Sequence, residues 1–480
     1  MEKLISKYRK ISVVARATLW FMICGIIQKG IAFLTMPVFT RLLTTEQYGT
    51  YSLYNSWLSI FTIFCTFRLD KAVFNKGMSK FPKERNEYVA SMQVTTSFLT
   101  IIVFILYLLF HNKINSVTGL STFITCAMFL ELFFHPALGF FNLKKRYEYK
   151  YISVIAVTLS YSIFNTGLGV FAVLLSSEAM KGNARILSSI AATLVFGSVL
   201  YIYNFYKAHF RIRINHIYFA LTFNLPLIPH YFSSYVLEQF DRLMISYYCG
   251  QGKVGMYSVA YNISLLLKLV TDSIHSAFTP WQYEKMREKK YKEVNDILLP
   301  IHLIILGLLI VFMAFAPEMM MLLADERYHE AMYAIPPISG SILFISLYGF
   351  YSNAEFFMDA NKFSSLMTMI GAVLNIILNA IFIPIYGFVA AGYTTLICYT
   401  VFAYAHILYS NYISKKKYEE QMFQISHLII LTVIIYVSSI IMSCLYGYML
   451  IRYVVIFAML SVLVIKRTTF ISLLQVLKKK

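Results

Sequence analysis

Three cationic side chains lie inside long apolar stretches of the sequence: Lys29, Arg242 and Lys268. Translocon-type scales place an ionised Lys near the middle of a membrane-spanning helix at about +2.5 to +3.5 kcal/mol. Such a charge needs a partner on another helix, in water or on a ligand. These three cations are therefore candidate ligand-binding residues.

Local partners differ among these cations. The positions three and four residues from Lys29 carry no acid, so its partner must lie elsewhere, and a structural ion pair with another helix is the alternative to ligand binding. Arg242 has Glu238 four residues earlier and Asp241 beside it, a spacing that favours an ion pair on one helix. Local pairing is therefore an alternative role for Arg242.

Two further basic residues have an equally simple alternative. Lys268 has Asp272 four residues later, so local pairing is as well supported as ligand binding. Arg68 lies at the inner end of its apolar stretch, from which a long side chain can reach the membrane interface. Both stay candidates for anion binding.

Three acidic residues in apolar stretches are candidates for ion coupling. Glu131 has His135 four residues on, Asp272 follows Lys268, and Glu355 has no cation within one turn. An intramembrane carboxylate can exchange a proton or bind a sodium ion, but it can equally neutralise a cation such as Lys29. The sequence leaves both roles open.

The elements that carry these residues are predicted to be transmembrane helices. Hydrophobic residues make up 59% of the 480-residue chain and charged residues only 14%, against about 25% in soluble domains. Apolar runs near the ~20 residues needed to cross a bilayer recur along the chain. We predict an all-α integral membrane protein with about fourteen spans, at residues 17–38, 49–68, 89–110, 118–141, 151–175, 185–206, 224–249, 254–279, 295–316, 334–358, 363–384, 387–410, 426–446 and 448–465.

The distribution of basic residues predicts the orientation. Most of the 42 Lys and Arg residues fall in alternate segments between spans, and positively charged loops stay in the cytoplasm. Both termini are therefore predicted to be cytoplasmic, with Lys144, Lys285 and Lys416 inside and Lys181 and Lys253 outside. The basic N-terminal stretch imitates a signal peptide, but the apolar run after it is too long for one and is predicted to be retained.

These patterns exclude several classes of function. The formal net charge of +19 is spread over short loops, so no nucleic-acid partner is expected. The connecting segments are too short for a soluble catalytic domain, so the chain is not expected to be an enzyme. Residues 250–255 match G-x-G-x-x-G, but the match falls in a turn between two predicted spans, where no nucleotide site is expected. The six cysteines lack C-x-x-C spacing and are expected to be buried hydrophobic side chains, and no cofactor is expected.

An internal repeat divides the predicted spans. Residues 49–55 and 255–262 carry similar Gly-x-Tyr-Ser segments at the openings of spans 2 and 8. Spans 1–6 and 7–12 are therefore predicted to be two copies of one six-helix unit, an organisation common in secondary transporters. The predicted division is an N-terminal lobe at 1–210, a C-terminal lobe at 211–412, and two added helices with a basic tail at 413–480.

Five segments along essentially the whole chain carry a family resemblance. The most specific is residues 36–49, which ends span 1 and opens span 2 with the sequence Met-Pro-Val-Phe-Thr-Arg-Leu-Leu-Thr-Thr-Glu-Gln-Tyr-Gly. The others are Leu225-Pro226, Asp241-Arg242, Gly255-x-Tyr257-Ser258, and Asn375-x-x-x-Asn379 followed by Ile383-Pro384-x-x-Gly387. The sequence resembles Wzx-type polysaccharide flippases of the MOP superfamily, which also includes MATE transporters and lipid II flippases.

The resemblance implies a flippase acting by alternating access between two lobes. Its substrate would be undecaprenyl-pyrophosphate-linked oligosaccharide repeat units, moved from the inner to the outer leaflet of the bacterial cytoplasmic membrane for capsule, O-antigen or exopolysaccharide synthesis. In the related lipid II flippases, cations on the first two helices of each lobe face a central cavity. By helix and approximate depth, Lys29, Arg68, Arg242 and Lys268 correspond to them and would bind the pyrophosphate and sugars.

Physical chemistry agrees with this implication, because a pyrophosphate leaving water needs fixed positive charge. The expected partners are the lipid-linked oligosaccharide and membrane lipids, with other membrane proteins of polysaccharide assembly as further candidates. The coupling ion is left open between H⁺ and Na⁺, with Glu131, Asp272 and Glu355 as its candidate ligands or as counter-ions.

Two alternatives to a flippase remain. A MATE-like drug antiporter would share the architecture, but its cavity should favour acids that bind cationic drugs. A membrane glycosyl polymerase or ligase would need Arg and His on a sizeable outer loop, and the longest predicted outer loop, residues 317–333, is short and acidic. Both alternatives are less well supported than the flippase.

Overall fold

The computed structural model describes residues 12–360 and 362–465, and all regular elements within these ranges are helices. The chain divides into two compact units, Met1–Tyr235 (unit 1) and Val236–Lys480 (unit 2). The all-α fold class predicted from the composition is confirmed. The organisation into six, six and two spans stays a prediction.

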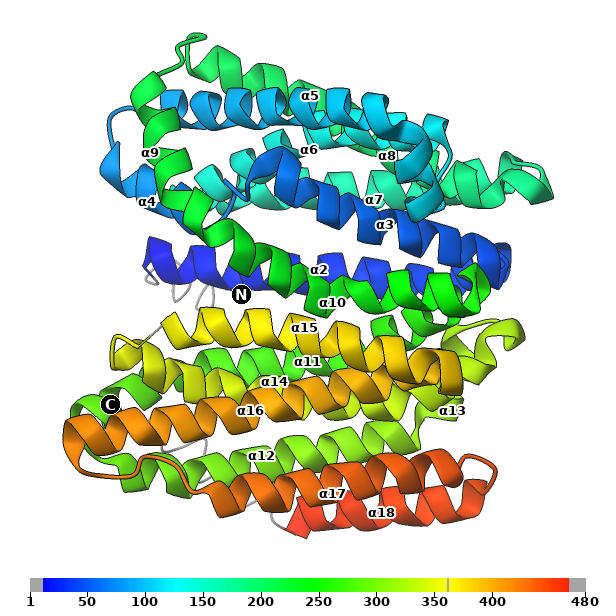
Figure 1. Ribbon diagram of the computed structural model, residues 1–480, viewed down its shortest axis with the longest axis vertical. Helices are drawn as coiled ribbons and strands as arrows, with labels where there is room; N and C mark the ends of the chain where they lie inside the picture. The colour runs from blue at the N-terminus through cyan, green and yellow to red at the C-terminus, as the bar shows by residue number, and fades with distance from the viewer. Residues whose placement is uncertain (1–11, 361, 466–480) are drawn as a thin grey trace, which may run out of the picture. The chain divides into compact units, whose positions relative to one another are not determined.

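Unit 1 is a bundle of long helices. Helix α6 packs against α5 and α8, α8 packs against α7, and α7 packs against α2 (Figure 1). One part of its core gathers Tyr54, Tyr107 and Phe129. Its elements are α2 (Val13–Leu42), α3 (Thr45–Thr66), α4 (Ala72–Lys80), α5 (Arg85–Thr118), α6 (Thr122–Tyr147), α7 (Tyr151–Leu175), η1 (Glu178–Met180), α8 (Lys181–Lys207), α9 (Ile214–Asn224), η2 (Leu225–Leu227) and the first part of α10 (Ile228–Cys249).

The corner between α2 and α3 is fixed by residues of the 36–49 segment. The Thr44 hydroxyl accepts from the Gln47 N–H at 3.2 Å, and the Gln47 side chain accepts from the Thr44 N–H at 3.1 Å. This reciprocal capping box satisfies two backbone donors that a helix start otherwise leaves unpaired. Gln47 also donates to the Glu178 carbonyl at 2.5 Å, which ties the corner to η1.

Unit 2 is built around α14. In its apolar window 78% of the residues are buried, the highest share among the candidate spans, and it packs against α16, α11, α12 and α17. Small residues allow this close packing, because a Cβ added at Gly392 of α16 would lie 2.9 Å from Pro337 of α14. The elements of unit 2 are the rest of α10, α11 (Gln251–Arg287), α12 (Tyr291–Ala314), α13 (Ala316–Leu323), η3 (Glu326–Ala334), α14 (Ile335–Phe357), α15 (Lys362–Tyr386), α16 (Val389–Tyr418), α17 (Ile425–Cys444) and α18 (Met449–Ile465).

Each of the fourteen predicted spans corresponds to a helix. Within the described ranges, eleven helices are long and apolar enough to cross a membrane, and Met449–Ser461 is a shorter apolar helix. The other two predicted spans are α3 and α10, which have the length of a span but a less apolar composition. Both carry polar side chains that bond within their own unit, as shown below.

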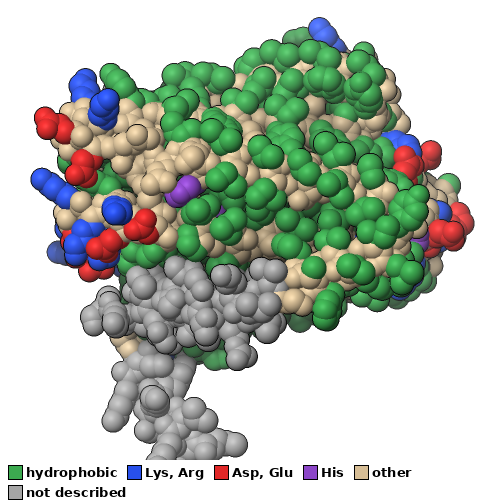
Figure 2. All heavy atoms as spheres, turned by 90° about the horizontal axis from the view of Figure 1, so that it is seen from below, with side chains coloured by type: hydrophobic (Ala, Val, Ile, Leu, Met, Phe, Trp, Pro, Cys, Tyr) green, Lys and Arg blue, Asp and Glu red, His purple; other side chains and the backbone are tan. Residues whose placement is uncertain are grey.

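Apolar side chains cover much of the surface. On the face shown in Figure 2, hydrophobic side chains form a broad band, and charged side chains gather at two opposite edges. Such a band matches the hydrocarbon layer of a bilayer. The cysteines only partly follow the prediction, because Cys24, Cys65 and Cys398 are buried whereas Cys444 is exposed at the end of α17.

The orientation in the membrane gives a direct prediction. In a variant without native cysteines, a Cys at position 289, between α11 and α12, should react with an impermeant thiol reagent only in inside-out vesicles. A Cys at position 113, in the last turns of α5, should react in intact cells. Both native lysines are exposed, so access to the residue itself does not limit labelling. The opposite pattern would reverse the assignment made from the charge bias.

Candidate functional site

Lys29 lies in the middle of α2 on an open face of that helix. Its side chain is exposed, and among the residues that the structure describes it has no hydrogen-bond or ion-pair partner. A Cβ added at Gly25, four residues earlier on the same face, would meet no atom within 4 Å. The alternative of a structural ion pair is therefore not seen for Lys29 within the described ranges.

Arg68 is buried and paired in the turn that follows α3. Residues Phe67 and Arg68 have φ angles of 45° and 53°, and these two left-handed residues turn the chain sharply at the end of α3. The guanidinium then lies 2.9 Å from Asp70 and donates to the Tyr235 hydroxyl. Asp70 supplies the negative charge that this buried cation requires.

Arg242 is buried in α10 and held by neutral groups. It donates to the Ser258 hydroxyl at 3.2 Å and to the Gln239 side chain at 3.3 Å. Its bond to Glu238, at 3.0 Å, goes to the backbone carbonyl and not to the carboxylate, so the expected local ion pair is not the arrangement observed. The guanidinium also lies 4.4 Å from the centre of the Tyr261 ring, a favourable cation–π distance.

Asp241, beside Arg242, is a buried carboxylate on which four helices converge. It accepts hydrogen bonds from Tyr257 of α11 at 2.8 Å, Asn379 of α15 at 2.7 Å and Thr395 of α16 at 2.9 Å. Asn379 also donates to Asn375 at 3.1 Å. Sequence reasoning did not select Asp241 as a site residue, although four of these five residues belong to the segments that carry the family resemblance.

Lys268 and Asp272 are the one pair of predicted site residues that the structure brings together. Their side chains form an i,i+4 ion pair on α11, with the ammonium 3.0 Å from one carboxylate oxygen. The local pairing expected from the spacing is confirmed. Because both side chains are partly exposed, the pair adds little stability.

Glu131 is buried in unit 1 without the expected histidine partner. Its two carboxylate oxygens accept from the Tyr54 hydroxyl at 2.6 Å and from the Thr193 hydroxyl at 2.9 Å. His135 is exposed. The hydroxyls of α3 and α8 therefore replace the i+4 imidazole as the groups that stabilise this carboxylate.

Glu355 of α14 has a hydrogen-bond partner on another helix. The carboxylate, in the last turn of α14, accepts from the Nδ1–H of His406 of α16 at 2.8 Å. Both side chains are buried. The partners are separated by 51 residues, so no spacing within one helix predicts them.

Arg185 of α8 is a buried cation that sequence reasoning missed. It donates to the Tyr51 hydroxyl at 3.1 Å and to the Asn165 side chain at 3.3 Å, and it lies 4.6 Å from the centre of the Phe39 ring. Gly169 makes room for it, because a Cβ there would lie 2.9 Å from the guanidinium. Arg185 is the first residue of the predicted span 185–206, so it was grouped with the basic residues of the adjoining loop.

Arg452 of α18 is a second buried cation that was missed, and it has a structural partner. It donates to Glu318 at 2.8 Å and to the Ala314 carbonyl at 2.7 Å. Burial alone would raise the pKa of the Glu318 carboxyl, but its hydrogen bonds and the positive charge of Arg452 together outweigh burial, and the pKa lies below its usual value. The pair fastens α18 to α13.

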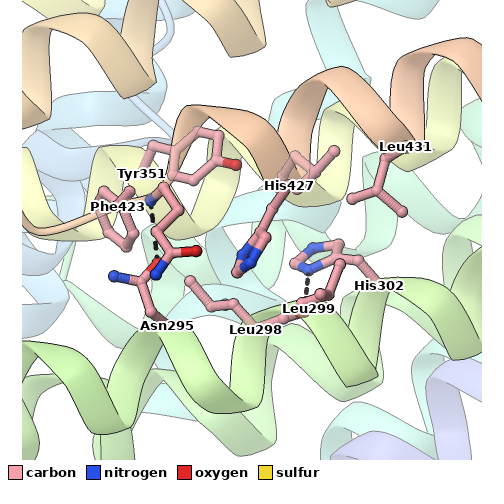
Figure 3. A pocket seen from close by; sticks show the side chains of 10 residues that line it. Asn295, Leu298, Leu299, His302, Tyr351, Phe423, His427 and Leu431 are labelled. Atoms are coloured by element: carbon pink, nitrogen blue, oxygen red, sulfur yellow. Dashed lines mark hydrogen bonds between the residues drawn. The ribbon is translucent and has the colours of Figure 1, made fainter.

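A small pocket lies in unit 2 between α12, α14 and α17. Figure 3 shows His302 and His427 directed toward its interior, with Asn295 and Tyr351 at one end. The seven residues predicted for substrate or ion binding do not line it. This pocket is therefore not the predicted anion site.

The charges inside the helices differ in what they can bind. Lys29, Arg185 and Arg242 have no carboxylate partner in the parts of the chain that the structure describes, whereas Arg68, Lys268 and Arg452 do. Of the unpaired cations, Lys29 alone is exposed. An exposed cation without a counter-ion can bind an anion directly, whereas a buried one must first be uncovered.

Comparisons with known proteins agree on one family. A family model described as polysaccharide biosynthesis protein matches residues 14–286. The probable low-salt glycan biosynthesis flippase Agl15 of Haloferax volcanii is 23% identical over 84% of either chain. The Lsg locus putative protein 1 of Haemophilus influenzae is 22% identical, and the match covers 56% of this chain and 66% of that protein, just under two thirds of its length.

Solved structures share the fold. The lipid II flippase MurJ in an inward closed conformation has a TM-score of 0.71 at 13% identity, covering 94% of this chain and 100% of that one. An inward-facing multidrug resistance MATE family transporter of the MOP superfamily has a TM-score of 0.61 at 14% identity, covering 81% and 96%. At these identities the likeness extends to the fold alone.

Proposed function

The chain belongs to the polysaccharide biosynthesis protein family, and from this premise we propose that it flips lipid-linked oligosaccharides across a membrane. Its substrate is an undecaprenyl-pyrophosphate-linked repeat unit. It moves this unit from the inner to the outer leaflet of the bacterial cytoplasmic membrane, by alternating access, for synthesis of a surface polysaccharide. Both termini lie in the cytoplasm.

The observation that carries the proposal is the exposed, unpaired Lys29 in the middle of a membrane-spanning helix. A cation at this depth is costly unless it binds a counter-charge. A pyrophosphate supplies about two negative charges and several strong acceptor oxygens. Lys29 is therefore the proposed pyrophosphate-binding residue of unit 1, and Arg242 and Lys268 are the candidates of unit 2, reached when their present partners are displaced.

The site works without catalysis of covalent chemistry, because flipping only relocates the headgroup. The lipid tail stays among membrane lipids, and other membrane proteins of polysaccharide assembly supply and consume the substrate. A coupling ion, H⁺ or Na⁺, resets the carrier. The buried carboxylates Glu131, Asp241 and Glu355 and the exposed Asp272 are the groups that can bind it.

A MATE-like antiporter is the second candidate, because the fold also matches a multidrug transporter. The buried carboxylates Glu131, Asp241 and Glu355 would suit cation binding. Each, however, already accepts hydrogen bonds from protein donors, whereas the exposed unpaired charge is basic. The flippase therefore fits the charges better.

A deletion strain tests the proposed function. Without the protein and without a second flippase, lipid-linked oligosaccharide should stay on the cytoplasmic leaflet and surface polysaccharide should be lost. In vesicles, collapsing an inside-negative potential should slow translocation, because outward movement of an anion gains about 2.3 kcal/mol per charge per 100 mV. An antiporter would instead change drug tolerance and leave the surface glycan intact, and normal surface polysaccharide in this strain would contradict the flippase.

A further inference from the structure

The pair formed by Glu355 and His406 joins the two most closely packed helices of unit 2, α14 and α16. The imidazole Nδ1–H donates to one carboxylate oxygen of Glu355 at 2.8 Å, and Ser410 donates to the same oxygen at 3.3 Å. Both side chains are essentially without solvent exposure, at 1% and 0%. The carboxylate thus faces an imidazole that can carry a full positive charge.

Aromatic rings surround the imidazole of His406. The ring centres of Tyr348, Phe363 and Phe402 lie 5.5, 5.6 and 5.9 Å from that of His406. These rings exclude other polar partners from the sides of the imidazole that they cover. An imidazolium beside the Glu355 carboxylate makes the pair neutral overall, whereas a neutral imidazole leaves it with one negative charge.

The pair is not saturated with hydrogen bonds, unlike a purely structural carboxylate. The second oxygen of Glu355 and the Nε2 atom of His406 are buried and have no partner among the described residues. Asp241, in the same unit, has both carboxylate oxygens occupied by protein donors. The second carboxylate oxygen of Glu355 and the Nε2 atom of His406 are the atoms to which water or a proton carrier would form hydrogen bonds.

Other titratable groups around α14 do not bond to the pair. His275 of α11 and His302 of α12 contact the ring of Phe350, and His427 of α17 lines the pocket beside Tyr351. At the inner end, Lys417 of α16 donates to the Met358 carbonyl.

Two acids act at a greater distance. Glu238 and Asp272 act electrostatically on Tyr348, next to His406, and Asp359 is exposed in the turn after α14. Element η3 packs at the opposite end of α14, away from Glu355. Whether the pair holds a proton therefore depends mainly on Glu355 and His406 themselves.

We propose that Glu355 and His406 form an exchangeable proton-binding site and that H⁺ is the coupling ion, an inference that rests on the proposed flippase function. One proton converts the pair from a net charge of −1 to zero. In the closed packing of α14 and α16, an unpaired carboxylate would be buried at high cost, so the proton is retained. It leaves to water only when the two helices separate enough to hydrate the pair.

This behaviour couples a proton to the transport cycle. The proton binds from the outside after the substrate has left, neutralises the pair and permits the empty carrier to close and return. It is released to the cytoplasm when the inner end of α14 and α16 opens. An acidic exterior therefore accelerates the reset step, independently of the effect of the potential on the anionic substrate.

The first test detects the proton directly in the purified full-length protein. Nitrogen-15 NMR of the histidine side chains, with His406 assigned by its loss in His406→Gln, is recorded between about pH 5 and pH 9, on either side of the ordinary histidine pKa of about 6.5. His406 should be an imidazolium at neutral pH in the native protein and neutral in Glu355→Gln. His427→Gln, a half-buried histidine of the same unit, should leave the His406 signal unchanged. A neutral His406 at pH 7 in the native protein, or one insensitive to Glu355→Gln, would overturn the proposal.

The second test follows transport in vesicles at a fixed membrane potential. An outside-acidic gradient of one pH unit should speed translocation of lipid-linked oligosaccharide by up to about tenfold. Glu355→Gln should lose this dependence, while His427→Gln keeps it. Equal rates with and without the gradient in the native protein would refute proton coupling and leave the flippase intact. No translocation under any gradient would refute the flippase, and the NMR result would then decide the proton site on its own.

Discussion

Replacing Lys29 by alanine is expected to abolish translocation of lipid-linked oligosaccharide. Truncating one member of a charge pair that is withdrawn from water costs about 2–5 kcal/mol, so the rate or affinity should fall about thirtyfold or more. The fold should be unaffected, because Lys29 contacts no partner among the described residues and its face of α2 is open. Removing an unpaired charge from mid-membrane, if anything, lowers the cost of inserting α2.

Matched variants distinguish the effect of the positive charge from the effect of the geometry of the side chain. Lys29→Arg should retain part of the activity, because it keeps the charge but changes the geometry of the donors. Lys253→Ala removes a lysine whose partner is Glu330 of η3, and it should transport normally. Translocation in vesicles is compared with the amount of folded protein in the membrane. Full transport by Lys29→Ala at normal expression would show that the residue is dispensable.

Replacing Asp241 by alanine is expected to cause the largest loss of stability of any single change in unit 2. The carboxylate accepts from Tyr257, Asn379 and Thr395, and its removal leaves three donors buried. An unsatisfied buried donor costs about 1–3 kcal/mol. Even with partial relaxation, the thermal unfolding midpoint in detergent should fall clearly, and the yield of folded protein should fall with it.

A graded series makes this prediction specific. Thr395→Val deletes one donor and should cost least, about 0.6 kcal/mol if it resembles other hydrogen bonds between membrane helices. Asp241→Asn keeps the shape but turns an amide NH₂ toward protein donors, so it should fall between Thr395→Val and Asp241→Ala. Unfolding midpoints in this order support the convergence of four helices on Asp241. A midpoint for Asp241→Ala equal to that of the native protein would contradict it.

Local reasoning about charge pairs succeeded where both partners are on the surface of one helix. Lys268 and Asp272 pair as their spacing predicts. Glu131 and His135 have the same spacing, but the carboxylate is buried and bonds to other helices. A buried charge must form hydrogen bonds with the side chains that pack against it, because no water is present to solvate it.

The residues with the largest roles in packing were the hardest to select. Asp241 is 138 residues from Asn379 and 154 from Thr395, and Glu355 is 51 residues from His406. The family resemblance marked Asp241, Tyr257 and Asn379 without indicating that they meet. A motif shows which residues matter together, but only the packing of helices shows the contact.

The sequence by itself determined the membrane-spanning helices and their approximate bounds, because the thickness of the hydrocarbon layer and the need to satisfy every backbone hydrogen bond leave a long apolar run few other structures. It also singled out Lys29, whose lack of a local partner can be read along one helix. Only the tertiary structure decided which charged side chains have a protein partner and which remain free to bind a ligand. Arg68 donates to Tyr235, Arg452 pairs with Glu318, and Glu355 pairs with His406, because side chains on different helices become neighbours only when the bundle packs.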